Sequence, residues 1–308
     1  MRKTVGLILL GLAAFLITAA LLVLLWVPGQ VMKTPLDVDS TTRLAGNATV
    51  LPSGPGSAVK AISRTVADGQ ASDGQVVVFD TFSCLIQDPD GTAPDCVDDQ
   101  DSDKRLVTAG TDRFATNRVT ALAVNGEKYV GVDAEPHEGL VNKFPFSVEK
   151  ETYPFWDGLV GRAVDATFQG EEEIDGLATY KFNVKLVDEP AEISNGISGL
   201  YSDDKTMWVD QGTGSIIDQN DKQTRKLDDG TTVLDLELSF TDETIAANVK
   251  AAKDNNAQLD LVGTAPVVLG ILGLLALVGG LLLSRAARAK DERPGGNHAE
   301  GRRARAAA

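Results

Sequence analysis

The sequence of 308 residues predicts a mainly β domain between two transmembrane α-helices. We expect antiparallel hairpins that form a barrel-like or curved sheet, with one short helix. Two uncharged apolar runs, one near each end of the sequence, predict the transmembrane helices. Short β-branched and aromatic runs separated by tight-turn dipeptides predict the sheet. A change to helical spacing just before the second apolar run predicts the short helix.

The two apolar runs cover residues 4–27 and 261–283. Each exceeds the roughly 20 residues that a spanning helix needs, and a helix pairs its own backbone groups inside hydrocarbon. Arg2 and Lys3 before the first run would also suit a cleaved signal peptide. However, the apolar core of a signal peptide is only about 7–15 residues long. We therefore expect an uncleaved anchor.

Basic residues flank both runs on the side away from the central segment. The positive-inside rule then places both ends in the cytoplasm of a two-pass cell-membrane protein. The predicted parts are a cytoplasmic start (1–3), a helix (4–27), an extracytoplasmic domain (28–260), a helix (261–283) and a basic cytoplasmic tail (284–308).

The central segment is strongly acidic. The chain has 29 basic and 44 acidic residues, of which the two tails hold nine and three, so the segment 28–260 has 20 and 41 and a net charge of −21. Such a domain repels nucleic acid and anionic surfaces, so we expect no nucleic-acid partner. The charge is explained either by solubility or by a role in binding cations.

Two cysteines, Cys84 and Cys96, both lie in the central segment. An even pair in an oxidising compartment predicts a disulfide, with two free thiols as the alternative. The acidic stretch 88–103 surrounds Cys96 and holds seven aspartates. This density of oxygen ligands suits Ca²⁺, but the spacing is not that of an EF-hand, and a solvated acidic loop is the other interpretation.

Turn dipeptides set the expected hairpins. Asn125-Gly126 and Asp175-Gly176 each lie between strand-like runs, which is typical of type I′ hairpins. A further tight turn is expected at 210–214, and strands at 75–86 and 231–240. Thr241 can cap a helix whose first turn is acidic, and this helix should lead into the second span.

Motifs for catalysis are absent: the sequence contains no P-loop, no dinucleotide-binding glycine pattern, no H-E-x-x-H and no G-x-S-x-G. The central segment has one histidine, His137, which we expect to be a solvated loop residue. We predict that the protein is not an enzyme and has no cofactor or metal site. A glycosidase-like carboxylate pair remains an alternative, since acids are abundant.

One segment, 142–158, is rich in aromatic residues and stiffened by two prolines. It either packs as ordinary core or forms an apolar wall that contacts acyl chains or sugar faces. On the second interpretation the ligand-binding residues are Phe144, Phe146, Tyr153, Phe155 and Trp156.

Three linked motifs, 131–158, 170–182 and 207–217, resemble the actinobacterial family of two-span membrane proteins of unknown function that bears the porin PorA name. The resemblance covers nearly the whole chain. It implies a β-rich extracytoplasmic domain between two helices, a layout similar to the class B scavenger receptors, which bind and tunnel lipids. It also implies a role in maturation of lipomannan to lipoarabinomannan in the cell envelope.

The leading hypothesis is therefore a membrane-anchored protein that binds or transfers lipids or lipoglycans, whose partners are membrane lipids or lipoglycans and membrane glycosyltransferases. The alternatives are a glycan-processing enzyme that uses carboxylates, a scaffold for membrane glycosyltransferases, and a porin. A porin needs strands with an outward apolar band, whereas this sequence places its apolar runs in two helices.

Overall fold

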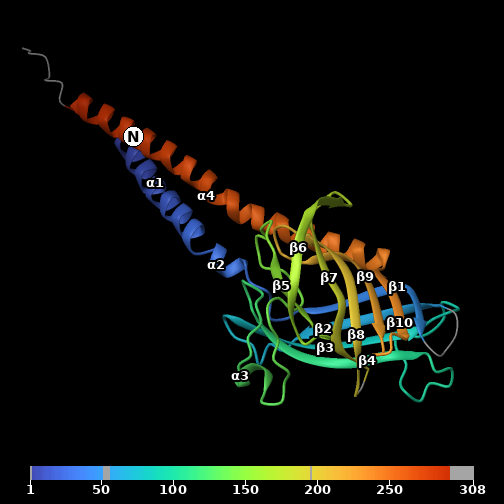
Figure 1. Cartoon of the computed structure of the whole chain (residues 1–308). Helices are drawn as coiled ribbons and strands as arrows, with labels where there is room; N and C mark the ends of the chain where they lie inside the picture. The colour runs from blue at the N-terminus through green and yellow to red at the C-terminus, as the bar shows by residue number, and fades with distance from the viewer. Residues whose placement is uncertain (1, 51–55, 195, 292–308) are drawn as a thin grey trace, which may run out of the picture. The chain divides into compact units, whose positions relative to one another are not determined.

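The computed structural model describes residues 2–50, 56–194 and 196–291 (Figure 1). The chain divides into two compact units. One is the β-rich unit Val31–Leu259, and the other comprises the described parts of Met1–Gln30 and Asp260–Ala308. The predicted fold class, a mainly β domain with a curved antiparallel sheet and two long apolar helices, is confirmed, and the structure adds short helices to it.

Ten antiparallel strands form one curled sheet in the order β4-β3-β2-β1-β10-β9-β8-β7-β6-β5. Strands that are neighbours in sequence pair with each other, except that β4 and β5 lie at the two edges, and β1 also pairs with β10, which joins the two halves. The strands are β1 (Asp39–Val50), β2 (Ser57–Ala67), β3 (Val76–Gln87), β4 (Leu106–Asn117), β5 (Tyr153–Asp157), β6 (Arg162–Ile174), β7 (Leu177–Ser194), β8 (Ile197–Asp210), β9 (Ile216–Lys226) and β10 (Thr232–Phe240).

The two faces of this sheet are filled in different ways. On the inner face, aromatic and aliphatic side chains of β5 to β8 pack with residues of the segment between β4 and β5. Further along this face, β10, β1, β2 and β3 contribute an aliphatic cluster around Leu236. The outer face is covered by three separate pieces: the short helix α3 (Glu127–Val130), the loop closed by the disulfide, and the first turns of helix α4 (Asp242–Asp291).

The curl is tight where the two halves join. Gly46 on β1 pairs with Leu238 on β10, and a Cβ atom at Gly46 would lie 1.8 Å from the backbone oxygen of Glu237. Real Cβ atoms do not approach a carbonyl oxygen this closely, so only glycine allows the two strands to meet here. The position therefore couples the β1–β4 half to the β5–β10 half.

The segment between β4 and β5 closes one end of the gap between these two edge strands. Val124 donates its backbone N–H to the carbonyl of Ala115 in β4, and Leu140 donates its backbone N–H to the carbonyl of Pro154 in β5. The extended segments around Ala123 and Leu140 are joined to each other by the hydrogen bond from the backbone N–H of Ala123 to the carbonyl of Gly139. The sheet is thus completed at this end by two short extended segments.

The helical unit contains α1 (Arg2–Leu25) and the C-terminal part of α4, and α2 (Pro28–Val31) follows α1. The helices contact each other through small residues: a Cβ at Gly280 would lie 3.0 Å from the backbone oxygen of Gly6. Small residues permit this close approach between membrane helices. Buried positions recur every seven residues, at Gly6, Ala13 and Ala20 on α1 and at Pro266, Gly273 and Gly280 on α4, where Ala276 is buried as well.

Most of the remaining surface of these helices is exposed and apolar, including Phe15, Leu22, Leu272 and Leu275. Two helices, Lys3–Leu25 and a part of Asp242–Ala286, are long and apolar enough to cross a membrane. These findings fit a membrane protein. The orientation of the two ends stays a prediction, and the tail beyond Asp291 lies outside the described residues.

One of the two predicted hairpin turns is confirmed and the other is wrong. Asp175 and Gly176 both have positive φ, 47° and 74°, and form the turn between β6 and β7 as predicted. Asn125-Gly126 is not a hairpin turn, because Gly126 has φ −84° and precedes the helix α3. The side chain of Asn125 instead pairs with the backbone of His137 at 2.7 and 2.9 Å, which replaces the expected strand partner.

The helix that begins after Thr241 is also confirmed, since the backbone N–H of Thr244 donates to the Thr241 hydroxyl at 3.3 Å. It continues without a break to Asp291. The helix near the sheet and the second apolar span are therefore one element.

Candidate functional site

A groove of about 310 Å³ lies over β1 and β2, beside the loop that the disulfide closes. Its floor is built by small residues, since Ala45 of β1 and Ala58 of β2 are exposed on this face of the sheet. Side chains of ordinary size at these positions would fill the hollow. The lining residues are Arg43–Gly46, Ala58–Ile62, Asp88, Gly91, Asp95 and Thr241.

Two cationic side chains rise from the floor toward the loop. Lys60 contacts the carboxylate of Asp88 at 3.1 Å and the backbone oxygen of Ala93. Arg43 donates to Asp95 at 3.0 Å. Hydrogen bonds from the backbone N–H of Ala93 and from Lys60 lower the pKa of Asp88, although partial burial opposes them. The groove thus combines a mainly apolar floor with a basic residue on each of its two strands.

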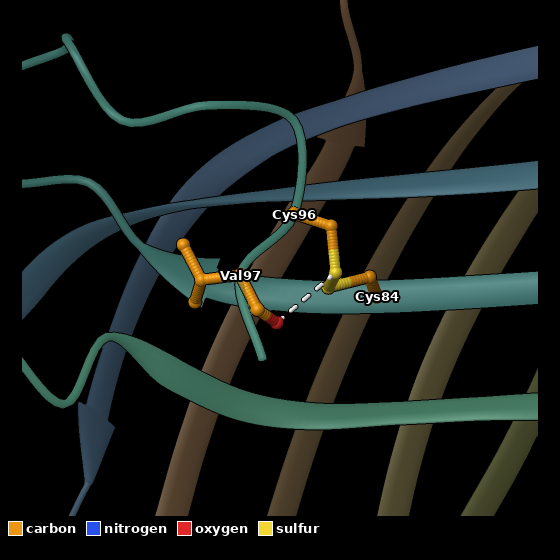
Figure 2. The surroundings of a disulfide bond; sticks show 3 residues. All are labelled: Cys84, Cys96 and Val97. Carbon is orange, nitrogen blue, oxygen red and sulfur yellow. Dashed lines mark hydrogen bonds between the residues drawn. A yellow bond between two sulfur atoms is a disulfide. The ribbon is translucent and has the colours of Figure 1, made fainter. Parts of the chain in front are cut away.

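The disulfide pins the loop that forms one wall of this groove (Figure 2). Cys84 on β3 is bonded to Cys96, with a Cα–Cα distance of 5.9 Å, so the predicted pairing is confirmed. The pair packs with Ile86, Ala93 and Val97 in a small apolar cluster on the outer face. Because this cluster and the disulfide hold the loop at one end, the loop lies against the sheet without filling the groove.

The aspartates of the acidic loop are directed to different partners. Asp88 binds Lys60, Asp95 binds Arg43, and Asp101 binds Arg105 at 2.5 Å. Within the described residues, no group of three or more His, Cys, Asp or Glu side chains is arranged to hold a metal ion.

The predicted aromatic residues occupy three different environments. Phe144, Tyr153 and Phe155 are buried in the inner-face core, where Phe144 stacks on Phe182 with ring centroids 4.6 Å apart. Phe146 is half-buried beneath the ammonium group of Lys143, 4.0 Å from its ring centroid. Trp156 is half-buried against His137. None of the five lines the groove, and their contact with a ligand stays a prediction.

The turn at 210–214 anchors this aromatic segment. Phe144 and Val148 donate their backbone N–H groups to Gly214 and Gln211. Gly214 has φ 74°, and a Cβ there would lie 2.2 Å from the Phe144 oxygen, which excludes other residues. Burial lowers the pKa of nearby Lys143 to about 8, and the carboxylate of Asp210 partly offsets this.

A buried ionic cluster lies on the inner face of β8 and β9. Lys205 is 3.1 Å from Asp203 and 3.4 Å from Asp221. Burial raises the pKa of Asp203 to about 7. The positive charge of Lys205 opposes this rise only in part, and the negative charge of Asp221 adds to it. The side chain of Asp203 is fully buried, and the ammonium group of Lys205 is the cation closest to it in this cluster. Such a cluster is costly to bury, and removal of its cation would leave two unpaired carboxylates.

The prediction that His137 is a solvated loop residue is wrong. Its side chain is 4 % exposed, and it packs between Phe114 of β4 and Trp156 of β5. Nε2 lies 2.9 Å from the carboxylate of Asp112. Burial alone would lower its pKa, but Asp112 and the backbone oxygen of Glu135 outweigh burial and raise it. His137 therefore ties together the two edge strands of the sheet.

Sequence reasoning missed both the groove and the ionic cluster. The groove depends on the pairing of β1 with β2 and on the position of a loop that follows β3, so no local pattern signals it. The ionic cluster has one local signal: Asp203 and Lys205 are charged residues at alternate positions of β8 that face the inner side of the sheet, where apolar residues are expected.

Comparison with known proteins identifies the family. The profile of the Porin PorA family matches residues 5–282, and the chain belongs to this family. It is 31 % identical over 102 residues to a Porin PorA of Corynebacterium amycolatum, a match that covers 29 % of this chain and 26 % of that protein. It is 24 % identical over 286 residues to a Porin PorA of Corynebacterium resistens, with coverage of 60 % and 68 %.

The chain thus spans about a quarter of the length of the first relative and about two thirds of the second. Among solved structures, the Aeromonas veronii immune modulator A aligns with 70 % of this chain and 99 % of its own length, at 7 % identity and a TM-score of 0.14. This likeness is too weak to support any argument about fold or function.

Proposed function

We propose that this member of the Porin PorA family binds an amphiphilic envelope lipid or lipoglycan outside the cell membrane, without catalysis, and presents or transfers it during envelope biosynthesis. The observation that carries the proposal is the groove beside the disulfide loop. It is at the small end of the 300–1,000 Å³ usual for ligand pockets, and its outward-facing lining combines Ala45, Ala58 and Ile62 with two ion pairs.

The chemistry of the groove suits an amphiphile better than a fully polar ligand. Ala45, Ala58 and Ile62 offer apolar contact to a hydrocarbon segment, and each buried methylene gains about 0.8 kcal/mol. Arg43 and Lys60 offer charged donors to the polar end of such a ligand. Both already contact aspartates, so a polar group would join existing ion pairs and would not meet a bare charge.

The arrangement of the chain supports the same proposal. Two apolar helices fit an anchor in the membrane, which would keep the β-rich unit near the lipids that it is proposed to bind. A groove of this volume would hold only part of the hydrocarbon of a lipid. The ligand could therefore be released to a partner such as a membrane glycosyltransferase without leaving a closed cavity.

The family's name suggests a pore, but the described strands do not favour one made by this sheet. A strand that faces lipid carries apolar side chains outward. Outward positions of these strands instead carry ion pairs, for example Arg64 with Asp39 at 2.8 Å and Lys222 with Glu237 at 2.9 Å. We therefore do not propose that the strands cross the membrane.

Native mass spectrometry of the full chain, purified in mild detergent, tests the proposal. Ala45→Trp fills the floor of the groove at an exposed position, so the fold should tolerate it. The matched control is Ala178→Trp, at an exposed position on β7. We expect bound lipid to fall at least fivefold in Ala45→Trp and to be unchanged in the control. Equal lipid in both variants would contradict the proposal.

A further inference from the structure

The two edges of the curled sheet are protected to very different degrees. β5 is five residues long, contains Pro154, and is covered by the extended segment around Leu140. The end of β4 near Thr116 is covered in the same way by Ala123. By contrast, the described residues leave the free edge of β4 without a backbone partner over Leu106–Arg113.

This part of β4 is exposed on both of its faces. The five consecutive residues Thr108–Asp112 are all exposed, although they alternate between the inner and outer sides of the sheet. On the neighbouring strand, Phe82 pairs with Thr111 and is 39 % exposed, because the short threonine side chain does not cover its ring. The edge therefore offers backbone groups together with open space beside an aromatic ring.

The sequence of this edge lacks the usual protection. Natural edges are blunted by proline, charged residues or bulges, yet residues 107–111 read Val-Thr-Ala-Gly-Thr, with no charge and no proline. Its one bulge lies at the very start of the strand, opposite Leu85 and Ile86. An unpaired, uncharged strand of this kind is a template for an added strand.

Acidic side chains mark both ends of the edge. Asp103 is exposed before it, and Asp112 and Asp80 are about half exposed at its other end, although each also contacts a basic side chain, namely Arg105, His137 and Arg113. Among the adjacent basic residues, Arg105 and Arg113 are already held by Asp101 and Asp68 at 2.5 and 2.9 Å, and Lys104 is exposed. The carboxylates around this edge still outnumber these three basic side chains. Asp98 and Asp99 of the preceding loop add exposed carboxylates. The electrostatic field at this edge thus favours cationic ends on an incoming strand.

We propose that the Leu106–Arg113 edge of β4 is a docking site for an extended segment of a partner protein, which is uncharged over about five residues and carries Lys or Arg at its ends. The partner adds a strand to the sheet beside β4. A second copy of this chain is a poorer occupant, because it would bring its own acidic ends against the same carboxylates.

The test uses the full chain in lipid nanodiscs and a fluorescent peptide of alternating Thr and Val over five residues, with two Lys at each end. Fluorescence anisotropy at low salt should show saturable binding. Two matched peptides serve as controls: one with Glu in place of each Lys, and one with N-methyl groups on alternate backbone nitrogens. We expect each change to weaken binding at least tenfold.

Protein variants locate the peptide. Backbone N–H groups of a strand point alternately to its two sides. One of the variants Ala109→Pro and Gly110→Pro therefore removes an N–H that points to the free edge, where the peptide would bind. The other variant removes an N–H that bonds to β3. The variant that keeps the thermal unfolding temperature should lose peptide binding. Equal binding of the N-methylated peptide, absence of saturable binding, or pairing of two copies through β4 in cross-linking would each overturn the proposal.

Discussion

The two faces of strands β1 and β2 show what separates a packed surface from one that can take a ligand. On the inner face, Leu44, Val59 and Ala61 join an aliphatic cluster with three leucines of β10, and the cluster is closed. On the outer face of the same strands, a loop crosses Ala45 and Ala58 without filling the space above them. The same backbone thus supports a core on one side and a groove on the other.

The difference arises from what covers each face. The inner face is buried by the curl of the sheet, which brings side chains of neighbouring strands together at close-packed density. The outer face is covered by a loop whose position is fixed by a disulfide and two ion pairs. The loop therefore forms one wall of the groove, but it supplies few apolar side chains to fill the space between itself and the sheet.

The largest effect that this comparison predicts is on stability. Leu236→Ala on the inner face removes a side chain that is 4 % exposed, and such changes cost roughly 2–5 kcal/mol of the free energy of unfolding. Ala45→Trp on the outer face should cost less than about 1 kcal/mol, since surface changes away from special features usually do. Urea unfolding of both variants measures the difference. A larger loss for Ala45→Trp than for Leu236→Ala would reverse the assignment of the two faces.

A smaller effect sharpens the role of the loop. In the double variant Cys84→Ser, Cys96→Ser, the loss of a disulfide with a sequence separation of 12 should lower the free energy of unfolding by roughly 3 kcal/mol. Because this bond holds one wall of the groove, bound lipid should fall as well while the protein is still folded. Near-ultraviolet circular dichroism establishes folding, and mass spectrometry measures lipid. Unchanged lipid in the folded variant would mean that the loop is not part of the site.

Features with a local physical cause could be predicted from the sequence. The two apolar runs, the turn at Asp175-Gly176 and the cap at Thr241 depend on a few adjacent residues, and the structure confirms each of them. The disulfide was predictable because only two cysteines exist.

Features that depend on distant residues could not be predicted. Asn125-Gly126 has the sequence of a hairpin turn, but Asn125 is taken by the backbone of His137, twelve residues later. His137 itself is buried only because β4 and β5 lie on either side of it. The groove requires β1, β2, the disulfide loop and the start of α4 together, and alanine residues in a strand carry no sign of the space above them.

Photoaffinity labelling tests the central claim, that the groove holds lipid, most directly. The full chain is incubated in membranes with a lipid that carries a photoreactive group near the polar end of its acyl chain, and the labelled peptides are identified by mass spectrometry. We predict adducts on residues 43–46, 58–62 and 88–96, and loss of these adducts in Ala45→Trp. Labelling confined to the helices at 3–25 and 260–286 would show only the lipid that surrounds any membrane helix, and would contradict the account.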